Sequence, residues 1–190
     1  MGNTEDIPKW KVTASRHVLR DRWISVRADD CVTADGVKIA PYYVLEYPDW
    51  VHMVALDASG RVLVTRQYRH GAGKVTTELP CGTVDASDAT PEAAARRELL
   101  EETGCDGVFT AAGSFSPNPA NHANTVHVFL VRDTRPVRRA ADDPTEVIRY
   151  EFMPIRELAR LFDSGEFSQS MHVCSVVAAL RRAGKLSEFR

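Results

Sequence analysis

The sequence RELLEETG at residues 97–104 decides the fold, because it belongs to a helix whose two ends are both marked. The preceding PEAAARR, from Pro91, consists of good helix formers, with proline at the position where a helix tolerates it best. Thr90 can cap the amino end, and Gly104 is typical of the residue that ends a helix. We therefore predict a helix from about Thr90 to Gly104.

Three acids cluster on that helix. Each helical residue advances about 100°, so Glu98 and Glu102 stack one turn apart with Glu101 beside them, while Leu99 and Leu100 point to the opposite side. Neighbouring carboxylates repel, and a hard divalent cation with a preference for oxygen ligands would relieve that repulsion. A solvated acidic face is the alternative interpretation.

Short strands dominate the rest of the chain. Runs rich in β-branched and aromatic residues, separated by turn signals, predict strands at 10–19, 23–32, 39–47, 51–56, 62–68, 75–79, 108–115, 125–131 and 147–153. Two closing helices are predicted at 156–162 and 171–182. The predicted class is α+β, with a mixed sheet flanked by helices.

Composition excludes several classes of protein. The 190 residues hold 24 Lys and Arg against 26 Asp and Glu, a net charge of −2 that argues against nucleic-acid binding by bulk electrostatics. The longest uncharged apolar run, 173–180, is too short to cross a bilayer, and the first residues do not read as a secretory signal. The four scattered cysteines form no C-x-x-C pair, so we expect reduced thiols in a cytoplasmic protein.

Residues 82–105 resemble the Nudix box, G-x5-E-x7-R-E-U-x-E-E-x-G-U, where U is a bulky apolar residue. The second half matches position by position from Arg97 to Cys105. In the first half, Asp88 stands at the place of the first Glu, and one extra residue separates it from Arg97. In the family that Glu supports the box through the Arg, and we expect Asp88 to do so with a shorter arm.

Flanking segments resemble the ADP-sugar diphosphatase branch of the Nudix family, and the resemblance runs from about residue 32 to 180. These segments are 64–71, 78–82, 116–120 and 143–148. The resemblance implies a Nudix fold, an α/β/α sandwich with a small antiparallel sheet at the amino end. It also implies a dimerising β-strand element at 1–48, a hydrolase domain at 49–190 and a homodimer.

The same resemblance implies the metal ligands. Glu98, Glu101, Glu102 and a distant Glu146 would hold Mg²⁺, or Mn²⁺ in its place, together with the backbone carbonyl of Cys81. The four glutamates also form the predicted catalytic set. Position 144, where the family often has an acid proposed as general base, holds proline. Asp143 or Glu146 then substitutes, or water activation rests on the metals alone.

Two arginines are candidates for binding phosphate. Arg66 and Arg69 lie on one predicted strand, and we expect both near one face. Surface ion pairs are the alternative. Glu78 would contact metal-bound water or a sugar hydroxyl, or else pair with Arg97 or Arg66.

Three aromatic residues are candidates for stacking on the nucleotide base. These are Tyr42, Tyr43 and Trp50, and packing in the core or in a dimer is the alternative for each.

The function predicted from these features is Mg²⁺-dependent hydrolysis of a nucleoside diphosphate sugar, with ADP-ribose giving AMP and ribose 5-phosphate. Another substrate of the branch, such as GDP-mannose, is the first alternative. A non-catalytic module that senses a nucleotide is an alternative of another class. We expect neither nucleic acid nor a membrane as a partner.

Overall fold

The computed structural model describes residues 7–141 and 147–189, and these form an α+β protein of two compact units. The first unit comprises the chain up to Tyr47 together with Ser116–Asn124, and the second comprises Pro48–Phe115 and the chain from Thr125 onward. The sequence predicted a boundary after residue 48 without assigning 116–124 to the amino-terminal part. Among the described residues, no helix has both the length and the apolar character that crossing a bilayer requires.

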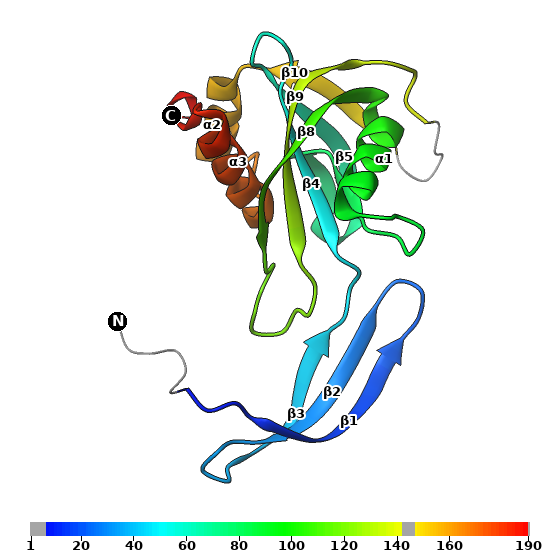
Figure 1. Cartoon of the computed structure of the whole chain (residues 1–190), viewed down its shortest axis with the longest axis vertical. Coiled ribbons are helices and arrows are strands. Elements are labelled where there is room, and N and C mark those ends of the chain that lie inside the picture. Colours follow the sequence, from blue (N-terminus) through cyan, green and yellow to red (C-terminus); the bar gives the residue numbers. More distant parts are fainter. Residues whose placement is uncertain (1–6, 142–146, 190) are drawn as a thin grey trace. The chain divides into compact units, whose positions relative to one another are not determined.

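The first unit is an antiparallel meander of three strands in the order β1-β2-β3 (Figure 1). Its strands are β1 (Lys11–Arg20), β2 (Ser25–Val32) and β3 (Lys38–Leu45). Gly36 lies in the turn between β2 and β3 at φ +82°, a conformation that glycine adopts without steric cost. Leu45 joins Ser116–Asn124 to this unit, since its N–H donates to Asn121 O at 2.7 Å and its carbonyl accepts from Ala123 N–H at 3.0 Å.

The second unit contains two sheets. One has the order β7-β4-β9-β8, and the other has the order β10-β5-β6. The strands of the first are β4 (Trp50–Ala55), β7 (Cys81–Thr83), β8 (Cys105–Phe115) and β9 (Val126–Pro136). Those of the second are β5 (Val62–Arg69), β6 (Lys74–Glu78) and β10 (Arg149–Met153). The pairing of β4 with β9 is parallel, and the neighbouring pairs are antiparallel.

Helices cover both faces of the β7-β4-β9-β8 sheet, with α1 (Pro91–Thr103) on one side and α3 (Ser170–Ala183) on the other (Figure 1). Alternate strand residues point to opposite faces, so each helix has its own core. Met53 and Phe129 pack with Leu99 of α1. Val54 and Val128 belong to the core that contains α3 and also α2 (Ile155–Asp163). This arrangement confirms the predicted sandwich.

Local chemistry fixes the ends of α1 as predicted. Thr90 Oγ1 accepts the Ala93 N–H at 3.1 Å, and Pro91 opens the first turn. Gly104 ends the helix at φ +69° with its N–H on Leu100 O at 3.0 Å. Capping of this kind stabilises a helix by about 1 kcal/mol.

The predicted elements all occur, and most of their ends agree to within about two residues. The exceptions are β8 and β9, since β8 begins at Cys105 rather than 108 and β9 extends to Pro136 rather than 131. The sequence also missed β7, a strand of three residues that no predicted element covers. Cross-strand pairing with neighbouring strands, rather than a pattern within the segment, extends these elements.

Candidate active site

Two acids of the last turns of α1, Glu98 and Glu101, form hydrogen bonds with Arg97. Nη1 of Arg97 donates to Glu98 Oε1 at 2.9 Å and to Glu101 Oε2 at 3.2 Å. Glu98 is largely buried, with 16% of its side chain exposed, whereas Glu101 is 46% exposed. One guanidinium therefore orients two carboxylates of the same helical turn.

Strand β7 lies at the end of its sheet and binds two of the acids through its backbone. Cys81 N–H donates to Glu102 Oε2 at 3.3 Å, and Thr83 N–H donates to Glu98 Oε1 at 3.2 Å. Between them, Gly82 approaches Glu98 so closely that an added Cβ would overlap its carboxyl group. Glu98 can therefore keep this position only while residue 82 lacks a side chain, and the backbone near the Cys81 carbonyl lies beside Glu98 and Glu102.

Asp88 holds Arg97 in place. Arg97 Nε donates to Asp88 Oδ1 at 3.2 Å and Nη2 donates to Oδ2 at 2.9 Å, a bidentate pair. Nη2 also donates to Thr83 O at 3.0 Å, which ties the guanidinium to β7. The shorter aspartate arm and the extra residue after it thus still permit the contact that the sequence led us to expect.

The buried position of Glu98 disfavours the ionised form of its carboxyl group. Burial is the main influence and raises the pKa of its carboxyl, although Arg97 and the Thr83 N–H oppose the shift. The ionised form of Glu98 is therefore incompletely compensated by the protein. A hard cation would compensate it, and the carboxylate oxygens present are the ligands that such a cation prefers.

The two candidate arginines lie on opposite faces of β5, which corrects the expectation that they share one. Residues three apart in a strand point to opposite sides. Arg66 pairs with Glu151 of β10 at 2.9 Å, and both side chains are about half exposed. Arg69 instead forms a bidentate pair with Glu78 of β6, with Nε to Oε1 at 3.0 Å and Nη2 to Oε2 at 2.7 Å.

Glu78 is almost fully buried, with 4% of its side chain exposed. Burial would raise its pKa, but the bonds from Arg69 and from Thr76 Oγ1 at 2.6 Å lower it below the usual value. The carboxylate is thus an anion held by a neighbouring cation. Its partner is Arg69, not the Arg97 or Arg66 considered from the sequence.

The remaining predicted residues lie elsewhere. Trp50 is half-buried and packs against the core on the α3 side. Tyr43 is 52% exposed on β3, in the first unit. Glu146, predicted to bind metal, lies outside the described residues.

Comparison with known proteins shows to which family the chain belongs. Residues 46–171 match the NUDIX domain, which covers α1, β7 and every acid discussed above. The chain belongs to the Nudix family. Residues 10–45 of this Nudix hydrolase match a second family, the nucleoside diphosphate sugar hydrolase N-terminal domain.

Relatives extend over most of this Nudix chain. It is 30% identical to an ADP-ribose pyrophosphatase of Mycobacterium tuberculosis over 87% of this chain and 81% of that protein. It is 24% identical to an ADP-ribose pyrophosphatase of Bacillus subtilis over 82% of this chain and 84% of the relative. A methanol dehydrogenase activator of Bacillus methanolicus is 23% identical over 69% and 70%, respectively.

A solved structure shares the fold. The crystal structure of an ADP compounds hydrolase superimposes with a TM-score of 0.82 and 21% identity, over 95% of this chain and 98% of the other. At this identity the likeness concerns the fold. It agrees with the α+β architecture expected from the sequence.

Two buried histidines near the site were not assigned from the sequence. His172 of α3 accepts the Leu79 N–H at its Nδ1 at 3.2 Å, and His52 of β4 contacts the His172 ring edge to face at 4.5 Å. Burial lowers the pKa of His52 to about 4 and that of His172 well below its usual value, so both rings are neutral at pH 7. No sequence signal finds them, because 93 residues separate His172 from Leu79.

Proposed function

We propose that this Nudix enzyme hydrolyses the diphosphate bond of a nucleoside diphosphate sugar, and that ADP-ribose, cleaved to AMP and ribose 5-phosphate, is its substrate. The observation that carries the proposal is the set of hydrogen bonds that links the acids of α1 to Arg97 and β7: Arg97 binds Glu98 and Glu101, and the backbone of β7 binds Glu98 and Glu102. The family match at residues 10–45 and the names of two relatives support the choice of substrate.

The carboxylate oxygens of α1 are the ligands that a hard divalent cation prefers, and we propose Mg²⁺, with Mn²⁺ as a substitute. Glu98, Glu101, Glu102 and the Cys81 carbonyl would hold the ion, and Glu146 is proposed to join them. When bound, such a cation supplies charge neutralisation at the diphosphate and a more acidic water. The raised pKa of the buried Glu98 supports the fit, because burial disfavours its anion by more than Arg97 and the Thr83 N–H compensate.

The protein side chains would supply orientation and binding. Asp88 fixes Arg97, which in turn fixes Glu98 and Glu101, so the acids need little reorganisation before reaction. Arg69 is 40% exposed, and we propose that its guanidinium, already fixed by Glu78, also contacts a phosphate. Arg66, Tyr43 and Trp50 are proposed to bind phosphate or base. Asp143 or Glu146 is proposed as the proton acceptor.

A homodimer and a cytoplasmic location complete the proposal. The first unit exposes Val12, Val18 and Leu19 of β1, each about half accessible, and these apolar side chains support association with a second copy. The four cysteines are free, which supports a reducing compartment.

The deciding experiment combines a substrate panel with a matched pair of variants. With Mg²⁺, the wild type is expected to release AMP from ADP-ribose faster than nucleotide from GDP-mannose or other sugar nucleotides. Glu102→Gln removes one charged ligand and is expected to lower kcat/KM at least about 100-fold. Glu92→Gln, a substitution of the same kind at an exposed position in the first turn of α1, should leave the rate unchanged.

Two outcomes would contradict the proposal. Nucleotide release that survives Glu102→Gln would argue against metal-assisted hydrolysis at this helix. A wild type that cleaves no sugar nucleotide but binds one, measured by calorimetry, would favour a nucleotide-sensing module instead.

A further inference from the structure

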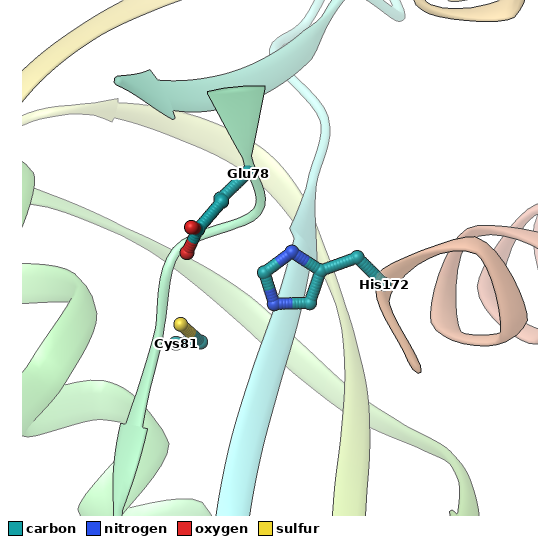
Figure 2. A group of neighbouring side chains, drawn as sticks. All are labelled: Glu78, Cys81 and His172. Atoms are coloured by element: carbon teal, nitrogen blue, oxygen red, sulfur yellow. The ribbon is translucent and has the colours of Figure 1, made fainter. Parts of the chain in front are cut away.

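Three side chains with ligand atoms meet where β6, β7 and α3 come together (Figure 2). They are Glu78, Cys81 and His172, and one ligand atom from each lies within 4.8 Å of the others. Glu78 and His172 are buried, and Cys81 is half-buried. This group belongs to the second unit alone.

The position of the imidazole proton argues against a second cation site. His172 Nδ1 accepts the Leu79 N–H, so in the neutral ring the hydrogen resides on Nε2. Nε2 is buried without a hydrogen-bond partner in the described chain, and as an N–H it offers no lone pair to a metal. Both oxygens of Glu78 are already engaged by Arg69, whose positive charge would repel a cation.

The bond that His172 does make has a specific target. Leu79 is fully buried between the end of β6 and Pro80, beyond the last β5–β6 pair of Thr65 with Glu78. A buried backbone N–H requires an acceptor, and His172 provides it from a helix 93 residues further along the chain.

The next two residues are held as firmly. Met53 N–H donates to Pro80 O at 3.0 Å, and Cys81 N–H donates to Glu102 at 3.3 Å. Residues 79, 80 and 81 are therefore each fixed by a bond to a different element: α3, β4 and α1.

The ring itself is immobilised. His172 is fully buried, meets His52 edge to face at 4.5 Å and stacks against Phe167 at 6.2 Å. His52 Nδ1 is 2.9 Å from Ser175 Oγ, and that hydroxyl donates to Met171 O at 2.8 Å, which leaves it to accept from His52. The acceptor presented to Leu79 is thus set by packing of the His172 ring against Phe167 and against His52, which is itself held by Ser175.

We propose that His172 is a positioning residue, which holds the backbone of residues 79–81 so that the Cys81 carbonyl stands beside Glu98 and Glu102 for divalent cation binding. The inference rests on the proposed function, because it assigns the Cys81 carbonyl to the metal. It adds a role for α3, which contributes no predicted ligand.

The test measures Mn²⁺ binding to the substrate-free enzyme by electron paramagnetic resonance. His172→Leu keeps an apolar side chain of moderate size but removes the acceptor, and it is expected to weaken Mn²⁺ binding about tenfold. His172→Asn places Oδ1 where Nδ1 was and is expected to restore binding to within about twofold of wild type, since the Leu79 N–H regains its acceptor.

The control is Val176→Ala, a core substitution in α3 one turn further on. Val176→Ala should lower the unfolding temperature and leave the Mn²⁺ affinity unchanged, because it keeps the hydrogen bond from the Leu79 N–H to His172. If His172→Leu does not fold, His172→Gln takes its place in the comparison with His172→Asn. The glutamine side chain is longer, so its amide lies past the Nδ1 position and is not placed to accept the Leu79 N–H.

The outcomes separate this inference from the proposed function. Equal Mn²⁺ affinity in wild type and His172→Leu, an equal loss in Val176→Ala, or no rescue by His172→Asn would overturn the positioning role and leave the hydrolase proposal standing. A wild type that binds no Mn²⁺ and cleaves no sugar nucleotide would overturn both.

Discussion

Gly82 shows at the scale of a single residue how the site depends on close approach of a backbone to a carboxylate. A Cβ on this residue would overlap the outer atoms of Glu98, which belong to a flexible side chain. The side chain can swing away at little cost to the fold. We therefore expect Gly82→Ala to lower kcat/KM by at least about tenfold while the unfolding temperature changes by no more than about 3 °C.

Thermal unfolding and steady-state kinetics on the same preparation check this prediction. Gly71→Ala is the matched control, since an added Cβ at Gly71 meets no atom within 4 Å, and it should leave both quantities near wild type. A Gly82→Ala enzyme of normal rate would show that Glu98 does not need its observed position.

Sequence reasoning found the residues whose signal is local and missed those whose role comes from distant contacts. Glu98, Glu101 and Glu102 lie within about one helical turn, so their spacing alone predicts that they share one side of the helix. The pairing of Arg69 with Glu78 depends on the register of β5 and β6, which no short pattern encodes. The contact of His172 with Leu79 depends on the packing of α3, and no pattern in the sequence near either residue predicts it.

At the scale of elements, β1 is the strand with the least protection in its unit. All ten of its residues are exposed, including Val12 and Val18 at 52% and 50%, and it stands at the edge of its sheet. We expect wild type to sediment at about twice the chain mass of 21.1 kDa. Val12→Lys with Val18→Lys is expected to shift the protein toward the single-chain mass, because charge opposes burial of this strand.

Analytical ultracentrifugation measures this association. Val37→Lys, at a comparably exposed valine between β2 and β3, serves as the control and should keep the mass of the wild type. A wild type that sediments as one chain at micromolar concentration would contradict association through β1.

Elements with a strong pattern in their own sequence were predictable, and β7, which has no such pattern, was not. The α1 helix has a threonine cap, a proline at its start and a glycine at its end, so its bounds followed from the sequence. By contrast, β7 has three residues in a segment rich in turn formers, and it is a strand because Val51 and His52 lie opposite Gly82 and Cys81. The neighbouring strand, rather than the segment, determines its conformation.

At the scale of the whole molecule, two buried neutral histidines couple stability to pH. Burial lowers the pKa of His52 from 6.5 to about 4 and lowers that of His172 as well. Between pH 6.5 and about pH 4, His52 binds a proton in the unfolded chain but not in the folded one. The free energy of unfolding therefore falls as the pH falls through this range. The expected loss from His52 alone is about 3 kcal/mol.

Urea unfolding at pH 7 and pH 4.5 measures this loss. His52→Asn keeps a donor for Ser175 but does not titrate, so its loss over the same range should be smaller by about 2 kcal/mol. An identical pH dependence in wild type and His52→Asn would show that His52 does not contribute to it.

The parallel pairing of β4 with β9 has a consequence for the order in which the protein matures. Trp50 lies opposite Val126, so the sheet that supports the acids joins segments 76 residues apart. Contacts between such distant segments form slowly, because a long loop must close first. During synthesis β4, β7 and α1 all emerge well before β9, so the acidic helix at first has only part of its sheet. A newly made chain therefore completes the sheet that supports these acids only once β9 has left the exit tunnel.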